Sequence, residues 1–280
     1  MKQRIITALI LAPLVILGIF QLSLPTFMAA LAVVTMIGFW EWTQFVEAKS
    51  RYFALVPAAI LFAVSAFLVP FDAYSLNEIS LSHLTLLGLG CAWWLFASVL
   101  AITYPKSATL WQGSTLLRHL FGILTLLPFF WGVVMLRAQD LYSDPFHGAR
   151  LVLFVCLIVW AADSGAYFVG KSIGKHKMAP KVSPNKTIEG LVGGMVTASL
   201  VAWGFSHWFE VPFTNAFVMV GITLATVIIS VLGDLVESMF KRVSGIKDSS
   251  NIIPGHGGVL DRIDSLTAAF PVFALLYFIF

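Results

Sequence analysis

The chain has 280 residues, of which 59% are hydrophobic and only 11% charged, with a formal net charge of +3. A soluble domain carries roughly 25% charged residues, so this composition excludes a protein whose whole surface faces water. The apolar residues also form unbroken runs near the ~20 residues that span a bilayer, whereas a soluble α/β protein breaks its runs after about 4–8 residues. The sequence therefore predicts an integral membrane protein.

Nine spans are expected along the chain. They lie at about residues 5–22, 25–45, 53–70, 84–103, 117–136, 150–170, 188–208, 214–238 and 265–280. The first follows Lys2 and Arg4 and is too long for the apolar part of a cleaved signal peptide, so we interpret it as a retained span. The predicted fold class is all-α, with about nine transmembrane helices.

Basic residues set the expected orientation, because cytoplasmic loops carry an excess of Lys and Arg. With the N-terminus inside, 15 of the 17 Lys and Arg residues, Lys49 among them, fall on the cytoplasmic side, and only Arg137 and Arg150 fall outside. Five acidic residues also fall outside. They are Asp72, Glu78, Asp140, Asp144 and Glu210. We therefore expect a cytoplasmic N-terminus and a C-terminus on the opposite side of the cell's inner membrane.

Polar residues are concentrated in the second half of the chain. Residues 1–145 contain five spans with short connections, whereas residues 146–280 contain four spans and two long cytoplasmic loops, at about 171–187 and 239–264. Asp163 lies deep in the sixth span, where a carboxylate is costly unless it faces a partner or water, so it is a functional candidate. We interpret residues 146–280 as the catalytic region.

The first long loop is preceded by an apparent nucleotide-binding motif. Residues 165–172 read GAYFVGKS, which fits the phosphate-binding pattern G-x-x-x-x-G-K-[ST]. That pattern needs a short buried strand before it and a soluble helix after it. Here a membrane-length apolar run precedes it and a loop rich in glycine and lysine follows. We interpret the match as coincidental.

The first long loop itself offers two interpretations. Its five lysines are typical of a loop that binds anionic lipid head groups. Alternatively, Ser183 or Thr187 caps the following helix, and Lys186 then lies beside a positive helix N-terminus, which suits a phosphate. Both interpretations remain open at this point.

The most polar segment spans residues 233–265. Three of its charged residues are spaced i, i+3 and i+7, which places them on one face of the eighth helix. They are Asp234, Glu237 and Lys241. Asp261 and Asp264 share a face just before the last span, and glycines around His256 let backbone N–H groups approach an anion. Carboxylates on two elements, flanked by Lys and Arg, suit Mg²⁺ and a polyphosphate together.

This segment resembles the signature of the phosphatidate cytidylyltransferase family, also called CDP-diacylglycerol synthases. The signature reads S-x-x-K-R, four residues, K-D, a short spacer and H-G-G-x-x-D-R-x-D. Eleven residues of the chain fit it in type and spacing. They are Ser238, Lys241, Arg242, Lys247, Asp248, His256, Gly257, Gly258, Asp261, Arg262 and Asp264. The segments around Asp163 and at residues 183–190 also resemble motifs of this family.

The resemblance implies transfer of a cytidylyl group from CTP to phosphatidate, giving CDP-diacylglycerol and pyrophosphate. It implies a divalent metal, usually Mg²⁺, with a neighbouring monovalent cation such as K⁺, and family members are often homodimers. The expected metal ligands are Asp234, Asp261 and Asp264. The expected catalytic residues are Lys241, Arg242, Lys247, His256 and Arg262. The expected substrate-binding residues are Asp163, Ser183, Lys186, Thr187, Glu189, Ser238, Gly257 and Gly258.

The implied chemistry agrees with these residue types. The lipid phosphate has a second pKa of about 6–7 by analogy with phosphoserine, so a strong general base is not required. Catalysis instead needs two anions to be neutralised while one attacks the α-phosphorus of CTP and pyrophosphate leaves. The expected partners are CTP, phosphatidate and membrane lipid, and nucleic acid is not expected.

Two other functions fit fewer features of the sequence. An anion transporter would explain Asp163 and Asp234 within spans, but its polar groups would gather at the membrane midplane rather than on one side. A CTP-dependent enzyme acting on an isoprenoid lipid would keep the chemistry and change the lipid. A transport assay compared with CTP turnover tests the first alternative, and CTP turnover with phosphatidate compared with an isoprenoid lipid tests the second.

Overall fold

The computed structural model describes residues 2–46 and 50–280, so Lys49, one of the basic residues expected on the cytoplasmic side, lies outside the described residues. Within these ranges the structure has nine long helices. They are α1 (Lys2–Gln21), α2 (Leu24–Val46), α3 (Arg51–Leu68), α5 (Leu81–Ile102), α6 (Thr115–Ala138), α7 (His147–Ile173), α8 (Ile188–Trp208), α9 (Ala216–Val243) and α10 (Leu260–Ile279). Four short elements complete the described chain. They are α4 (Ala73–Asn77), the 3-10 helix η1 (Lys106–Leu110), and the antiparallel strands β1 (Lys177–Ala179) and β2 (Ser183–Thr187).

The long helices form a membrane-spanning bundle. Eight of them, α2, α3 and α5 to α10, are long and apolar enough to cross a membrane, and α1 contains a shorter apolar stretch, Leu9–Gln21. Large apolar side chains such as Phe67 and Phe217 point outward from the bundle, where acyl chains rather than water suit them. The chain is therefore an all-α integral membrane protein, and its nine long helices coincide with the nine predicted spans.

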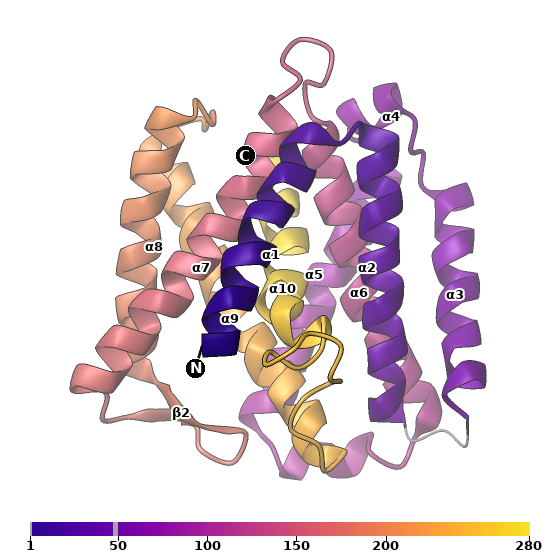
Figure 1. The fold of residues 1–280 in the computed structure, drawn as a ribbon, viewed down its shortest axis with the longest axis vertical. Coiled ribbons are helices and arrows are strands. Elements are labelled where there is room, and N and C mark those ends of the chain that lie inside the picture. The colour runs from indigo at the N-terminus through magenta and orange to yellow at the C-terminus, as the bar shows by residue number, and fades with distance from the viewer. Residues whose placement is uncertain (1, 47–49) are drawn as a thin grey trace.

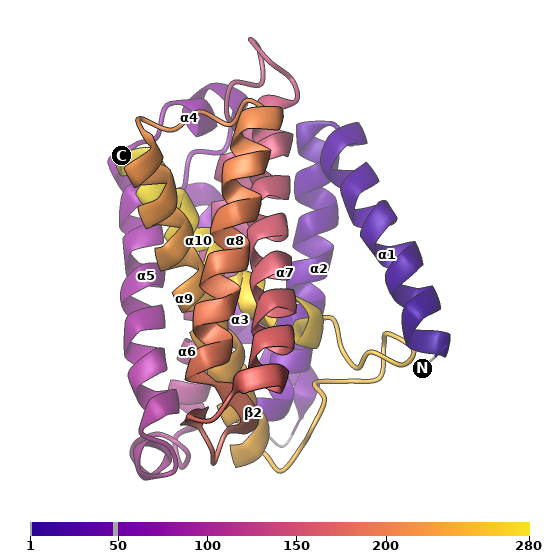
Figure 2. The same cartoon turned by 90° about the vertical axis from the view of Figure 1, so that its left-hand side faces the viewer.

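Helix α6 lies at the centre of the bundle. It is buried along most of its length and packs against α2, α5, α7 and α10 (Figure 1). Helix α1 leans away from the other helices, as the side view shows (Figure 2). A cluster of aromatic side chains, including Trp42, Trp111 and Phe240, packs near the end of the bundle that carries β1 and β2. In this cluster Trp42 and Trp111 pack against Phe240, in the last turns of α9.

Helices α9 and α10 extend beyond the eighth and ninth predicted spans into the second predicted loop. Helix α9 continues to Val243 and α10 begins at Leu260, so the connection is residues 244–259 rather than 239–264. The eighth predicted span ended at residue 238, after Asp234 and Glu237, and the ninth began at residue 265, after Asp264. The helices instead continue into the polar region, because Lys241 and its carboxylate partners satisfy one another there. Asp261 and Asp264 consequently lie in the first turns of α10, on a rigid element.

Candidate active site

Strand β2 leads directly into α8, and one residue caps the junction. The Thr187 hydroxyl accepts a hydrogen bond from the Gly190 N–H at 3.1 Å, which satisfies a backbone donor in the first turn. Ser183 instead begins β2 and pairs with Ala179 of β1. Thr187 is therefore the cap, which decides between the two candidates that the sequence left open.

Helix α8 packs unusually close to α7. A Cβ atom on Gly194 would lie 2.7 Å from the Ala162 carbonyl oxygen, and one on Gly190 would lie 2.9 Å from the Ala166 carbonyl oxygen. Glycine at both positions removes that overlap and lets the two backbones touch. The close approach holds the end of β2 beside the polar part of α7.

A cavity of about 280 Å³ lies between α7, α8 and α9. The Lys186 ammonium is 2.6 Å from Asp234 Oδ2 and donates to the Val231 carbonyl oxygen at 3.0 Å. Asp163 and Tyr167 line the same cavity. The structure thus brings together Asp163, Lys186 and Asp234, which were predicted from separate motifs. Lys186 was expected to suit a phosphate, and its partner here is the Asp234 carboxylate.

The polar face of α9 continues toward the end of the helix. The Ser238 hydroxyl donates to Asp234 Oδ1 at 3.2 Å, and Lys241 Nζ lies 3.1 Å from Glu237 Oε1. Lys241 Nζ also donates to Asp261 Oδ1 at 2.9 Å, which joins α9 to α10. Both Glu237 carboxylate oxygens are buried and accept no hydrogen bond from the part of the chain that the structure describes. The face shared by these residues was predicted, and it is confirmed.

At the two glycines after His256, the backbone of the connection curves past Asp261, and residues of the connection donate hydrogen bonds to its carboxylate. Asp261 Oδ2 accepts hydrogen bonds from Ser249 N at 2.8 Å, Ser249 Oγ at 3.0 Å and Gly258 N at 2.7 Å. Gly257 has φ +81°, and a Cβ atom there would lie 2.6 Å from Asp261 Oδ2. A side chain at Gly257 would therefore be both strained and overlapping. The glycines bring backbone N–H groups to this carboxylate rather than to an empty anion site.

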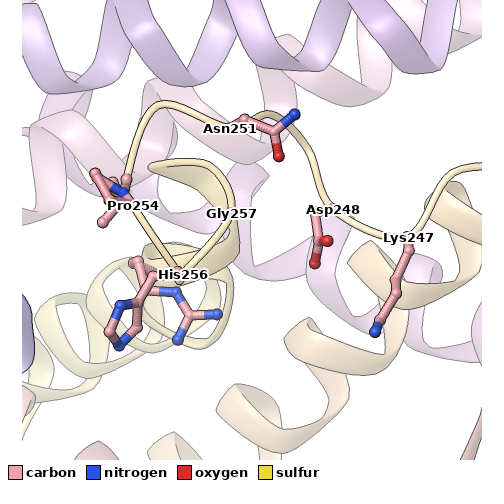
Figure 3. A pocket seen from close by; sticks show the side chains of 9 residues that line it. Lys247, Asp248, Asn251, Pro254, His256 and Gly257 are labelled. Carbon is pink, nitrogen blue, oxygen red and sulfur yellow. The ribbon is translucent and has the colours of Figure 1, made fainter. Parts of the chain in front are cut away.

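A larger cavity of about 700 Å³ lies beside the connection, within the 300–1,000 Å³ typical of small-molecule sites. Lys247 and Asp248 lie on one side of it and His256 on the other (Figure 3). Asn251 and Arg262 complete its polar lining. Two cationic side chains and an imidazole outnumber the single carboxylate, so the cavity suits a polyanion.

Two predicted residues have described contacts with the β1–β2 hairpin rather than with either cavity. Arg242 Nε donates to the Val182 carbonyl oxygen at 3.2 Å. Glu189 accepts hydrogen bonds from Lys175 N at 3.0 Å and from His176 N at 3.2 Å, and its other oxygen lies 2.5 Å from His176 Nδ1. These contacts brace the hairpin. Direct roles for Arg242 in catalysis and Glu189 in substrate binding stay predictions.

The three expected metal ligands lie near one another in the fold, but each carboxylate interacts with a different partner. They are Asp234, Asp261 and Asp264. Among the described residues, no three His, Cys, Asp or Glu side chains form a ready-made metal site. Lys186 and Lys241 pair with two of the three carboxylates. With the buried Glu237, four carboxylates face two ammonium groups, and oxygen donors with surplus negative charge fit a divalent cation. Their role as ligands stays a prediction.

Glu41 on α2 is a site residue that sequence reasoning missed. Its carboxylate is fully buried and accepts four hydrogen bonds from the connection and the start of α10. The donors are Ser249 Oγ at 2.9 Å, Ser250 Oγ at 2.5 Å, Val259 N at 3.0 Å and Leu260 N at 2.6 Å. A signal existed, because Glu41 is a carboxylate within the second predicted span, flanked by two tryptophans.

Comparison with known proteins finds one family and several full-length relatives. The model of the cytidylyltransferase family matches residues 2–280. A phosphatidate cytidylyltransferase of Haemophilus influenzae is 46% identical over 291 residues, covering 99% of this chain and 99% of that protein. A protein of the same name from Pseudomonas aeruginosa is 41% identical, and the match covers 99% of this chain and 96% of that protein. Another from Bacillus subtilis is 33% identical, and the match covers 100% of this chain and 97% of that protein.

Proposed function

This chain belongs to the cytidylyltransferase family, and we propose that it transfers a cytidylyl group from CTP to phosphatidate, giving CDP-diacylglycerol and pyrophosphate. It is a membrane-bound nucleotidyltransferase of phospholipid biosynthesis. The observation that carries the proposal is the 2.9 Å contact between Lys241 Nζ and Asp261 Oδ1. That contact joins the two ends of the signature into one polar wall, with a basic cavity of about 700 Å³ beside it.

The two cavities suit the two substrates. The larger one has Lys247 and Arg262 to neutralise the triphosphate of CTP, and His256 as a further polar group in its lining. The smaller one lies between three spanning helices, where an anionic lipid can bring its head group to Lys186 without leaving the bilayer. Lys186 would then exchange the Asp234 carboxylate for the lipid phosphate. This arrangement lets a soluble substrate and a membrane substrate approach from different sides.

The reaction forms one bond and breaks one bond. A phosphate oxygen of phosphatidate bonds to the α-phosphorus of CTP, and the bond to the bridging oxygen of pyrophosphate breaks. No proton has to be removed first, because the lipid phosphate is mostly ionised near neutral pH. Lys241 is held by Glu237 and Asp261, so its ammonium is fixed in place, and Lys247 and Arg262 balance charge on the leaving pyrophosphate.

Mg²⁺ is proposed as the cofactor, with Asp234, Asp261 and Asp264 as its ligands. When bound, it supplies neutralisation of phosphate charge and stabilises the leaving group. Support comes from the donor chemistry, since carboxylate oxygens are the ligands that Mg²⁺ prefers. The buried Glu237, with no hydrogen bond to either oxygen among the described residues, is a further carboxylate in this region.

The active site is proposed to face the cytoplasm from the cell membrane. The β1–β2 hairpin and its flanks expose Lys175, Lys177 and Lys181, and basic residues gather on the cytoplasmic side of membrane proteins. CTP is a soluble cytoplasmic metabolite, which supports the same side. The relatives are bacterial, so the inner membrane is the proposed location.

Purified protein in detergent tests the proposal directly. Labelled CTP, phosphatidate and Mg²⁺ are expected to give CDP-diacylglycerol and pyrophosphate in equal amounts, and omission of phosphatidate should stop both. The same assay with a phosphorylated isoprenoid lipid tests the alternative substrate. Absence of CDP-diacylglycerol, or faster turnover of the isoprenoid, would overturn the proposal.

A further inference from the structure

Among the described residues, four uncharged donors make hydrogen bonds to the buried carboxylate of Glu41. Two are backbone N–H groups at the start of α10, Val259 and Leu260, and two are the hydroxyls of Ser249 and Ser250. A buried carboxylate without such donors would be strongly unfavourable. Here a helix N-terminus supplies positive potential as well as hydrogen bonds. Glu41 therefore links α2 to the connection and to the start of α10 through these hydrogen bonds. Helix α2 belongs to the half of the chain in which the sequence shows no recognised motif.

Ser249 links Glu41 to Asp261. Its hydroxyl lies 2.9 Å from Glu41 Oε2 and 3.0 Å from Asp261 Oδ2, while its backbone N–H donates to Asp261 at 2.8 Å. A hydroxyl has one proton, so it bridges the two carboxylates and donates to one at a time. Gln44, one turn further along α2, donates from its side-chain amide to the Ser249 carbonyl oxygen. The position of Asp261 thus depends on α2 through one shared residue.

There is no room for a side chain at Gly258, where the connection contacts Glu41 of α2. A Cβ atom at Gly258 would lie 2.5 Å from Glu41 Oε1 and 2.6 Å from Glu41 Oε2. The Ser249 hydroxyl oxygen would lie still nearer to that Cβ atom, so the Ser249 hydroxyl and the Glu41 carboxylate together occupy the space that a side chain at Gly258 would need. This contact relates a signature residue to a residue more than 200 positions earlier in the chain.

We propose that Glu41 is a positioning residue for cytidylyl transfer. It holds residues 249–260 in the conformation that aligns Asp261 and the cavity wall, and it acts through Ser249 without contacting substrate. The inference rests on the proposed function, since it assigns Glu41 a part in that reaction. The charge is essential to the role, because a glutamine would present an NH₂ group to backbone N–H donors. An aspartate keeps the charge but is one methylene shorter.

Three variants test the proposal in detergent-purified protein. Glu41→Gln is expected to lower kcat about 10²-fold, the scale of an active-site misplacement of about 1 Å. Glu41→Asp should recover part of that loss, because it restores a charged acceptor for the four donors but is one methylene too short to reach all of them equally. Thr35→Val is the matched control, since Thr35 is a buried polar residue of the same helix whose hydroxyl, in the described part of the chain, donates to the Leu31 carbonyl oxygen of α2 itself. Its kcat should equal that of wild type.

Hydrogen exchange separates positioning from general destabilisation. In Glu41→Gln the amides of residues 249–262 should exchange faster, while those of α6 and α7 keep wild-type protection. Faster exchange throughout the bundle, or an equal kcat loss in Thr35→Val, would overturn the proposal. If Glu41→Gln does not fold, Ser250→Ala serves instead, because it removes one of the four hydrogen bonds. Unchanged exchange at residues 249–262 in that variant would also overturn it.

Failure of the two proposals gives different results. A wild-type protein that makes no CDP-diacylglycerol contradicts the proposed function. A wild-type protein that makes it, together with a Glu41→Gln variant of wild-type kcat and wild-type exchange, contradicts only the positioning role.

Discussion

The substitution Asp261→Asn removes one charge from the centre of the candidate site and preserves the side-chain shape. In the structure Asp261 Oδ1 receives Lys241 Nζ at 2.9 Å, while Oδ2 accepts three hydrogen bonds from Ser249 and Gly258. The asparagine oxygen can keep the three hydrogen bonds on the Oδ2 side. Its NH₂ group then faces the Lys241 ammonium, so the ion pair between α9 and α10 is lost.

The size of the effect follows from burial and from the remaining partner of Lys241. Removing one partner of a buried ion pair costs about 3–5 kcal/mol. Lys241 retains Glu237 at 3.1 Å, so the lower end, about 3 kcal/mol, applies. If that loss appears in the transition state, at 1.36 kcal/mol per tenfold in rate, turnover should fall about 10²-fold. The proposed loss of a metal ligand would add to this.

Steady-state turnover of labelled CTP against Mg²⁺ concentration measures the effect. Asp234→Asn and Asp264→Asn should behave like Asp261→Asn, with lower kcat and a shifted Mg²⁺ dependence. Asp248→Asn is the comparison variant, because Asp248 is exposed at the wall of the larger cavity, and its loss should be milder. If Asp261→Asn keeps near-normal activity and Mg²⁺ dependence while Asp248→Asn loses both, the assignment of the metal ligands is wrong.

Three further predictions concern the topology, Lys171 and Lys186. Asn251→Cys, at an exposed position of the connection, should be labelled by an impermeant thiol reagent only from the cytoplasmic side, and labelling from the other side in intact cells would contradict the orientation. Lys171→Ala should keep most turnover, since Lys171 Nζ lies 5.6 Å from the Tyr167 ring centroid at the exposed end of α7; a loss of ~10³-fold in kcat would show that the apparent phosphate-binding motif is functional. Lys186→Met should raise KM for phosphatidate more than KM for CTP, and an equal change in both would argue against the smaller cavity as the lipid site.

The number and order of the helices could be read from the sequence, because the length of each apolar run must match the thickness of the bilayer. The same physical rule misplaced the ends of α9 and α10. The predicted spans ended at residue 238 and began at residue 265, whereas Lys241 lies within α9 and Asp261 within α10, where the two form an ion pair. Periodicity did place Asp234, Glu237 and Lys241 on one helix face, since that face depends only on local helical geometry.

The partners of these side chains were decided by the tertiary structure. Spacing along the chain could not show that Lys186 of β2 pairs with Asp234 of α9, nor that Glu41 of α2 accepts hydrogen bonds from the start of α10, because each contact joins elements that are distant in sequence. The sequence also left Ser183 and Thr187 equivalent as caps, and both lie in the β1–β2 hairpin; only Thr187 directly precedes α8 and accepts the hydrogen bond from Gly190 N. The sequence alone determines which segments enter the membrane and which residue types gather at one end. Packing determines which donor meets which carboxylate, because several donors compete for each buried charge and only the folded backbone sets their distances.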